Sequence, residues 1–76
     1  MSGYPIGIRW RAVDKNGDIA EFWLVSRSGK YYERWFWKVV YSDGSLEAND
    51  WKIGKRAARD EAAMHLFGKV RFKRVR

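Results

Sequence analysis

The sequence predicts an α+β fold, an antiparallel β-meander of three to five strands with one α-helix packed across one face. Two observations carry this prediction. The first two thirds of the chain hold short stretches of alternating apolar and polar residues separated by turn sequences, and residues 55–67 form one run of strong helix formers. With 76 residues, the chain is expected to fold as a single small domain, 1–76, with a short lead-in at residues 1–5.

The first predicted strand spans residues 6–13. Ile8 and Trp10 fall on one of its faces, and Arg9 and Arg11 fall on the other, as expected for a half-buried strand. The other predicted strands are residues 19–26, residues 30–41 and a short segment at residues 46–48. The turns between them are predicted at Asn16-Gly17, Gly29 and Asp43-Gly44.

The third predicted strand, residues 30–41, is rich in aromatic residues. Its odd positions are the more apolar, so Trp35, Trp37 and Val39 are expected to face the core. Its even positions then face solvent and interleave rings with cations, in the order Lys30, Tyr32, Arg34, Phe36 and Lys38. Nucleic-acid platforms use this pattern, because rings contact bases or sugars while cations contact phosphates. The alternative is that the rings only stabilise strand pairing.

The predicted helix runs from Lys55 to Phe67, with Asn49 or Asp50 as its N-cap and Gly68 as its stop. The residues expected to pack on the sheet, from their i, i+4, i+8 spacing, are Ala58, Ala62 and Leu66. Residues 69–76 are expected to form either a fifth strand or a basic tail, because apolar and basic residues alternate there.

The positive charge of the chain lies entirely in its last third. Residues 1–51 hold seven basic and seven acidic residues, whereas residues 52–76 hold nine basic and two acidic residues, which accounts for the net charge of +7. Such asymmetry indicates a polyanionic partner, most often a nucleic acid. The alternative is that the charge only keeps the protein in solution.

No combination of residues typical of an active site is found in the sequence. The chain has no Cys, and its only histidine, His65, has no nucleophile at a readable spacing. A Gly-rich phosphate loop and a metal-ligand pattern are also missing. We therefore expect a protein that is not an enzyme and needs no metal or cofactor. Without a secretion signal or a long apolar run, a cytoplasmic location is expected, with no membrane partner.

Residues 24–68 resemble the arm-type DNA-binding domains of phage integrases and the related AP2-like fold. The resemblance lies in the strand start at Gly29-Lys30-Tyr31, the turn at Asp43-Gly44 and the helix with Glu61-Ala62 in its middle. It implies a three-stranded sheet, followed by a helix that packs across it, whose outer face enters the major groove of DNA.

The helix also resembles the last helix of double-stranded RNA-binding domains. The matching residues are Gly54, Lys55, Arg56, Ala57, Ala58, Ala62, Ala63 and Leu66. In those domains the cations at the start of the helix contact phosphates across the major groove. This resemblance implies duplex RNA as an alternative ligand.

The hypothesis that follows is a small basic nucleic-acid-binding module, with duplex DNA favoured over RNA. The predicted contacts from the sheet are Arg9, Arg11, Tyr32, Arg34, Phe36 and Lys38. The predicted phosphate contacts from the helix start and the C-terminal segment are Lys52, Lys55, Arg56, Arg59, Lys69, Arg71, Lys73 and Arg74. The alternative hypothesis is a phage- or mobile-element-type regulator that docks on an acidic partner protein, since basic patches steer association with acidic proteins equally well.

Overall fold

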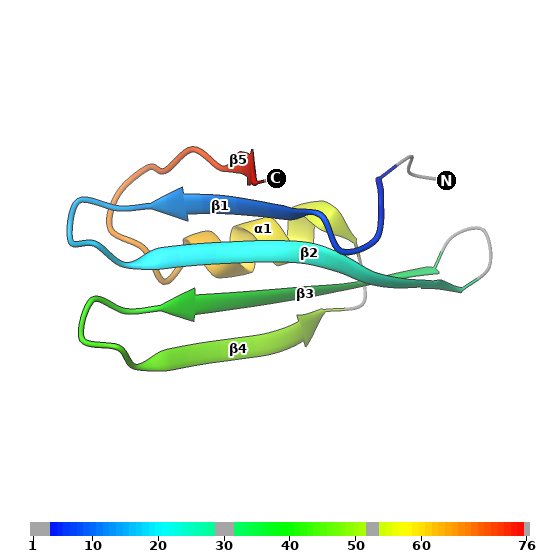
Figure 1. Cartoon of the computed structure of the whole chain (residues 1–76), viewed down its shortest axis with the longest axis horizontal. Coiled ribbons are helices and arrows are strands. Elements are labelled where there is room, and N and C mark those ends of the chain that lie inside the picture. Colours follow the sequence, from blue (N-terminus) through cyan, green and yellow to red (C-terminus); the bar gives the residue numbers. More distant parts are fainter. Residues whose placement is uncertain (1–3, 29–31, 52–53, 76) are drawn as a thin grey trace.

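The computed structural model describes residues 4–28, 32–51 and 54–75, which form five strands and one helix (Figure 1). The elements are β1 (Arg9–Val13), β2 (Ile19–Ser28), β3 (Tyr32–Val40), β4 (Leu46–Trp51), α1 (Lys55–Ala63) and β5 (Lys73–Val75). Neighbouring strands are antiparallel throughout, in the order β4-β3-β2-β1-β5. The prediction of an α+β fold built on an antiparallel meander is thus confirmed, and the sheet has five strands.

The hairpin between β1 and β2 closes at the predicted turn. Gly17 has a φ of 84°, a conformation that glycine adopts without steric cost. The carboxylate of Asp14 accepts hydrogen bonds from the backbone amides of Asn16 at 2.9 Å and of Asp18 at 3.0 Å. The side chain of Asp14 therefore holds the loop in a closed turn. The predicted turn before β4 also forms, where Gly44 has a φ of 90°.

Strands β2 and β3 form the longest pairing in the sheet. It runs from Ile19 opposite Val40 to Ser28 opposite Tyr32, and its register shifts between Leu24 and Ser26. A shift of this kind is a β-bulge, which leaves one residue unpaired and increases the local twist. Beyond the bulge, the pairing of β2 with β3 continues from Ser26 opposite Arg34 to Ser28 opposite Tyr32. These residues form the two-stranded arm of the hairpin.

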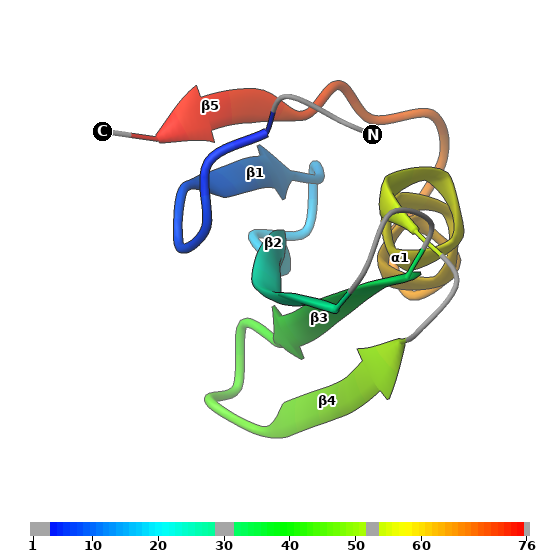
Figure 2. The ribbon, with the colours of Figure 1, turned by 90° about the vertical axis from the view of Figure 1, so that its right-hand side faces the viewer.

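The apolar core joins the sheet to the helical segment. Trp35, Phe22, Leu24 and Val39 are its largest fully buried side chains. Ala58 and Ala62 of α1, and Leu66 just after it, belong to the same cluster. Figure 2 shows α1 to one side of the sheet. The predicted core positions of the aromatic strand, Trp35, Trp37 and Val39, are all buried.

Helix α1 begins at Lys55, as predicted, but its N-cap and its C-terminal end differ from the prediction. The prediction that Asn49 or Asp50 caps it is wrong, because both residues belong to β4, which continues to Trp51 and pairs with β3. Gly54 takes the N-cap position instead, with a φ of 131° and no side-chain hydrogen bond. The helix therefore begins directly after a glycine in the left-handed region of φ.

The chain just after the helix is tied to the first hairpin by a hydrogen bond. Regular helix ends at Ala63, four residues before the predicted end. Beyond it, the backbone amide of Phe67 donates to the second carboxylate oxygen of Asp14 at 2.8 Å, a contact that spans 53 residues of sequence. Before Phe67, the amides of His65 and Leu66 already bond the carbonyls of Ala62 and Ala63, three residues back, so the regular helical pattern has ended there. The contact with Asp14 then ties the chain after the helix to the first hairpin.

The basic C-terminal segment forms the fifth strand of the sheet. Residues 73–75 pair with β1, and Arg11 lies opposite Lys73 while Trp10 lies opposite Arg74. Residues 69–72 lead from the end of the helical segment to this strand without regular structure. In the described ranges, α1 is too short and too polar to cross a membrane.

Candidate nucleic-acid interface

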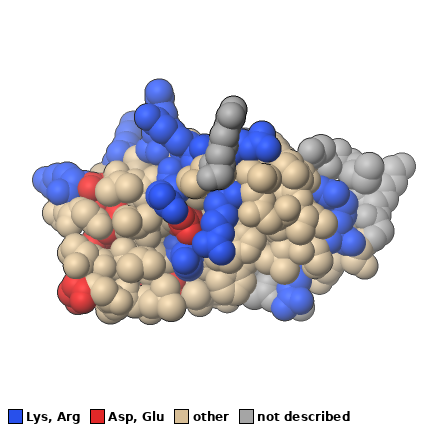
Figure 3. Space-filling view, in the orientation of Figure 1, with Lys and Arg blue, Asp and Glu red and all other residues tan. Residues whose placement is uncertain are grey.

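The side of the sheet opposite the core, called here the open face, carries a concentration of basic side chains. Alternation places Arg9 and Arg11 of β1 there, because Trp10 and Ala12 pack into the core. Lys38 of β3 lies on the same face, because Trp37 and Val39 are buried. Figure 3 shows Lys and Arg gathered around a small acidic spot near the middle of this side. The predicted sheet contacts Arg9, Arg11 and Lys38 are therefore brought together by the fold.

A single carboxylate holds this group of cations in place. Glu21 of β2 is only 3% exposed, and its Oε1 accepts a hydrogen bond from Nη1 of Arg9 at 2.9 Å. Its Oε2 accepts from Nε of Arg11 at 2.6 Å, and Nζ of Lys38 lies 3.6 Å from Oε1. We call Arg9, Arg11, Lys38 and Glu21 the cation cluster. Three positive charges surround one negative charge in it, so the cluster keeps an excess of two positive charges.

Burial raises the pKa of Glu21, but the surrounding cations outweigh that effect. Hydrogen bonds from Arg11 and Arg9, and the charges of Arg11 and Lys38, bring the pKa of this carboxyl below its ordinary value. Glu21 is therefore ionised at neutral pH. A buried carboxylate in this position fixes the directions of the three cations above it.

The cations of the cluster still reach solvent. The side chains of Arg9, Arg11 and Lys38 are 41%, 46% and 32% exposed, whereas that of Glu21 is 5% exposed. A guanidinium has five N–H donors, and Glu21 occupies only some of them. The outward donors of Arg9 and Arg11 can therefore meet an external anion while their inward donors stay bonded to Glu21.

Aromatic rings continue the open face beside the cluster. The guanidinium carbon of Arg9 lies 4.1 Å from the ring centroid of Trp23, and Trp23 lies 5.0 Å from Phe36 at an interplanar angle of 36°. The rings thus pack against each other and against Arg9, which stabilises the position of the guanidinium. Sequence reasoning missed Trp23, although its parity with Glu21 in β2 already placed it on this face.

Two further predicted sheet residues lie along β3. Arg34 shares the face of Phe36 and Lys38 by alternation, and it is exposed. Tyr32 is exposed at the start of β3, where it pairs with Ser28 beyond the bulge. Both residues therefore lie on the arm of the β2–β3 hairpin, away from the cation cluster.

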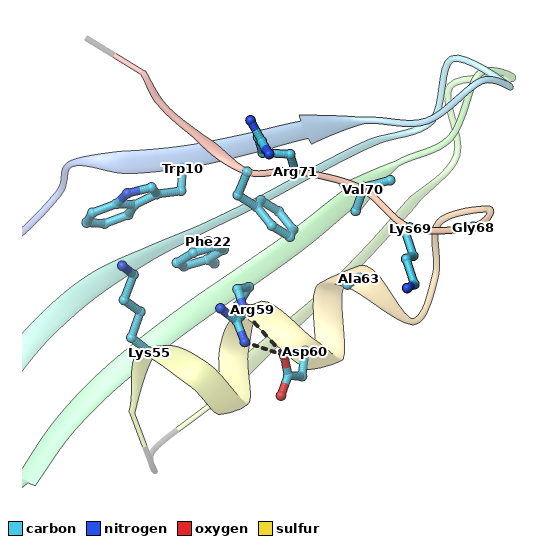
Figure 4. Close-up of a pocket in the computed structure, with 11 residues that line it drawn as sticks. Trp10, Phe22, Lys55, Arg59, Asp60, Ala63, Gly68, Lys69, Val70 and Arg71 are labelled. Atoms are coloured by element: carbon cyan, nitrogen blue, oxygen red, sulfur yellow. Dashed lines mark hydrogen bonds and ion pairs between the residues drawn. The ribbon is translucent and has the colours of Figure 1, made fainter.

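Most of the predicted phosphate contacts in the described residues lie away from the open face. Lys55 and Arg59 of α1 and Lys69 and Arg71 of the C-terminal segment line a groove together with Trp10 and Phe22, which point toward the core side (Figure 4). We call this side of the sheet the helix side. Arg74 also lies there, because it is paired with Trp10, whereas Lys73 is paired with Arg11 and lies on the open face.

Of the two remaining predicted contacts, only Arg56 belongs to the described residues. Arg56 is exposed at the start of α1, beside a shallow hollow formed with Gly54 and Ala57. Lys52 lies outside the described residues. The fold therefore divides the described basic residues that were predicted as contacts between two sides of the sheet.

The only histidine belongs to a polar cluster at the other edge of the sheet. Nδ1 of His65 lies 3.1 Å from the hydroxyl of Tyr41 and 3.4 Å from Oε2 of Glu47, and its ring stacks on Trp37 at 5.0 Å. Burial raises the pKa of Tyr41, and the nearby charge of Glu47 adds to that effect. In the parts of the chain that the structure describes, no group of three or more His, Cys, Asp or Glu side chains could hold a metal ion.

No protein family model, curated protein or solved structure was found to match this chain. The resemblances to integrase arm-type domains and to double-stranded RNA-binding domains therefore stay predictions from the sequence.

Proposed function

We propose that the protein is a small nucleic-acid-binding module that binds the backbone of duplex DNA through the open face. In this proposal α1 packs across one face of the sheet and leaves the other face to the ligand. The residues that would contact the duplex are Arg9, Arg11, Arg34, Lys38 and Lys73, with Tyr32 and Phe36 beside them.

The observation that supports the proposal most strongly is the cation cluster. Three cations are held by a buried carboxylate with their outer surfaces exposed, so little side-chain freedom remains to be lost on binding. Arg also matches the geometry of phosphate oxygens, because its planar donors form bidentate contacts. A surface arranged in this way fits a row of phosphates better than it fits a single small anion.

The packing of the aromatic rings favours a duplex over a single strand. Stacking of bases on a sheet requires rings with an open face, as in single-strand platforms. Here Arg9 covers Trp23, and Trp23 packs on Phe36. A base would have to displace the guanidinium to stack on Trp23, whereas a phosphate can contact that guanidinium without any rearrangement.

The test uses two charge-matched variants, one on each side of the sheet. K38Q/K73Q removes two positive charges from the open face, and K69Q/R71Q removes two from the helix side. Binding to a fluorescently labelled duplex DNA is followed by anisotropy over a salt series, with duplex RNA and single strands in parallel. Lys38 makes the longest of the contacts to Glu21, so K38Q/K73Q keeps the hydrogen bonds from Arg9 and Arg11.

The open-face variant is expected to bind duplex DNA about tenfold more weakly, which corresponds to about 0.7 kcal/mol for each lost phosphate contact. Its log–log salt slope should fall by about two relative to the parent protein. The helix-side variant should change affinity by about twofold or less, since it shares only the change in net charge. Equal losses in the two variants, or no binding of the parent protein at low salt, would contradict the proposal.

A further inference from the structure

A groove lies on the helix side of the sheet, between α1 and the segment that leads to β5. Its volume is about 860 Å³. Lys55, Arg59 and Ala63 form the wall that belongs to α1, and residues 68–72 form the opposite wall (Figure 4). A volume of this size is within the range of clefts that bind organic ligands.

The floor of the groove is aromatic. Trp10 stacks on Phe22 with a centroid distance of 5.4 Å and an interplanar angle of 6°. Phe72 meets Phe22 edge-on at 4.9 Å, and both Trp10 and Phe72 are only half-buried. The floor therefore presents apolar surface that an incoming apolar side chain can cover.

The walls carry an excess of positive charge. Four basic residues line the groove, and its one acidic residue, Asp60, already accepts two hydrogen bonds from Arg59 at 3.2 Å and 3.1 Å. Nζ of Lys55 lies over the rings of Tyr4 and Trp10. Within the described ranges, Lys69 and Arg71 have no acidic partner and are exposed. Lys69 and Arg71 could therefore contact an anion in the groove without breaking an existing ion pair.

The backbone of the C-terminal wall is also open to a ligand. Residues 69–72 precede the ladder between β1 and β5, whose last pair is Arg11 with Lys73. Among the described residues, none of the backbone hydrogen bonds outside helices and strands involves residues 69–72. Their amides and carbonyls are therefore able to pair with an extended chain laid along the groove.

We propose that this groove binds a short acidic segment of a partner protein, with an apolar or aromatic side chain on the floor and carboxylates against the basic walls. Charge complementarity and the aromatic floor together favour such a segment, because a peptide can supply both kinds of group on one chain. A nucleic-acid duplex carries its charge on the outside and has no side group that reaches a floor between two walls. The inference does not depend on the proposed function, since the groove and the open face lie on opposite sides of the sheet.

The probes are three capped pentapeptides of equal length. The first, acetyl-Asp-Leu-Glu-Phe-Asp-amide, has both carboxylates and apolar side chains. The second, acetyl-Asn-Leu-Gln-Phe-Asn-amide, has the same shape without charge, and the third, acetyl-Asp-Gly-Glu-Gly-Asp-amide, keeps the charge without the apolar side chains. Binding to the full chain is followed by NMR shifts of backbone amides and of the Trp indole N–H groups, which also locate the site.

The first peptide is expected to shift the indole of Trp10 and the amides of residues 69–72. The uncharged and the glycine peptides should each bind about tenfold more weakly, since each lacks one of the two contributions. K69Q/R71Q should weaken binding of the first peptide about fivefold or more, and K38Q/K73Q should leave it within about twofold. Ala63→Glu adds a carboxylate to the wall formed by α1, so it should also weaken binding of the first peptide. This variant is a second, independent test of the groove if K69Q/R71Q folds poorly.

Two outcomes would overturn the inference. Equal binding of the first peptide and of the third, glycine-containing peptide would show that the groove attracts negative charge in general and does not bind the apolar side chains. Shifts confined to the open face would place the peptide on the proposed nucleic-acid surface instead. A wrong assignment of the groove can be told apart from a wrong proposed function. K38Q/K73Q is expected to weaken mainly the binding of duplex DNA, whereas K69Q/R71Q is expected to weaken mainly the binding of the peptide.

Discussion

Replacing Glu21 by Gln removes the one negative charge that holds the cation cluster together. The carboxylate accepts hydrogen bonds from Arg9 and Arg11 and lies close to Lys38, and it is almost fully buried. Gln can still accept through its single carbonyl oxygen, but its buried amide group adds two donors that face other donors. We therefore expect the substitution to lower the free energy of unfolding.

The size of the loss follows from the exposure of the partners. Each hydrogen bond to a charged group contributes about 1.5–3 kcal/mol when its partner stays buried. Arg9 and Arg11 are more than two fifths exposed, so they can turn toward water and recover much of this energy. The amide left without an acceptor adds about 1–3 kcal/mol, and the expected net loss is about 2–3 kcal/mol. A domain of this length has a total stability of about 4–11 kcal/mol, so the variant should still fold.

The assay is urea unfolding of the parent protein, Glu21→Gln and Glu21→Leu, followed by Trp fluorescence. With a slope of about 1 kcal/mol per molar urea, the midpoint of Glu21→Gln should fall by about 2–3 M. Glu21→Leu should lose about 1 kcal/mol less than Glu21→Gln, because it removes the carboxylate without burying new donors.

The free energies of unfolding of the parent protein and of Glu21→Gln, measured across pH, separate the effect of the charge of Glu21 from the effect of its size and shape. Because the folded pKa of Glu21 is below its ordinary value of 4.5, its ionised form stabilises the protein fully above that value. This stability is lost as the pH falls through the lower, folded pKa. The difference between the parent protein and Glu21→Gln should therefore be constant near neutral pH and become smaller in acid, where only the cost of the buried amide remains. A difference that is absent at neutral pH, or that persists undiminished in acid, would show that the charge of Glu21 does not hold the cation cluster.

Ala62→Leu tests the packing of the helix, with Met64→Leu as its control, and Asp14→Asn tests the attachment of the following segment to the first hairpin. Ala62→Leu should lower stability by about 1–3 kcal/mol, because Ala62 is fully buried in the core and a larger side chain forces the helix away from the sheet. Met64→Leu, at a side chain that is 74% exposed, should stay within about 0.5 kcal/mol in the same thermal unfolding assay. Asp14→Asn should lower the melting temperature at neutral pH, because the hydrogen bond from the amide of Phe67, aided by other backbone amides, holds the pKa of Asp14 below its ordinary value of 3.8. That difference should shrink as the pH falls through the folded pKa, and a difference that did not change in acid would show that the carboxylate charge is unimportant there.

The local pattern of the chain was sufficient to predict most of the sheet. Alternation identified the buried positions of β3 and placed Arg9 and Arg11 opposite Trp10, because side chains of a strand point alternately to its two faces whatever the rest of the fold is. Gly17 and Gly44 located the turns before β2 and β4 for a similarly local reason, namely the cost of positive φ for other residues, whereas the predicted turn at Gly29 lies outside the described residues.

The start of the helix at Lys55 was predicted, but its N-cap and its C-terminal end did not follow from the same local rules. Asn49 and Asp50 have good N-cap side chains, but pairing with β3 keeps them in an extended strand. Phe67 continues a run of helix formers, but its amide bonds to Asp14, which is distant in the sequence. In both places a tertiary contact outweighs local propensity, which differs by only about 0.7 kcal/mol between ordinary residues.

The antiparallel α+β architecture, the excess of positive charge in the last third and the basic residues opposite the core of β1 all follow from the local sequence. The grouping of these charges depends on the fold. Folding brought Glu21 beneath Arg9, Arg11 and Lys38, and it carried Lys69 and Arg71 to the other side of the sheet. The physical reason is that the alternation of a strand decides which face a side chain takes, whereas the order and register of the strands decide which side chains meet on that face.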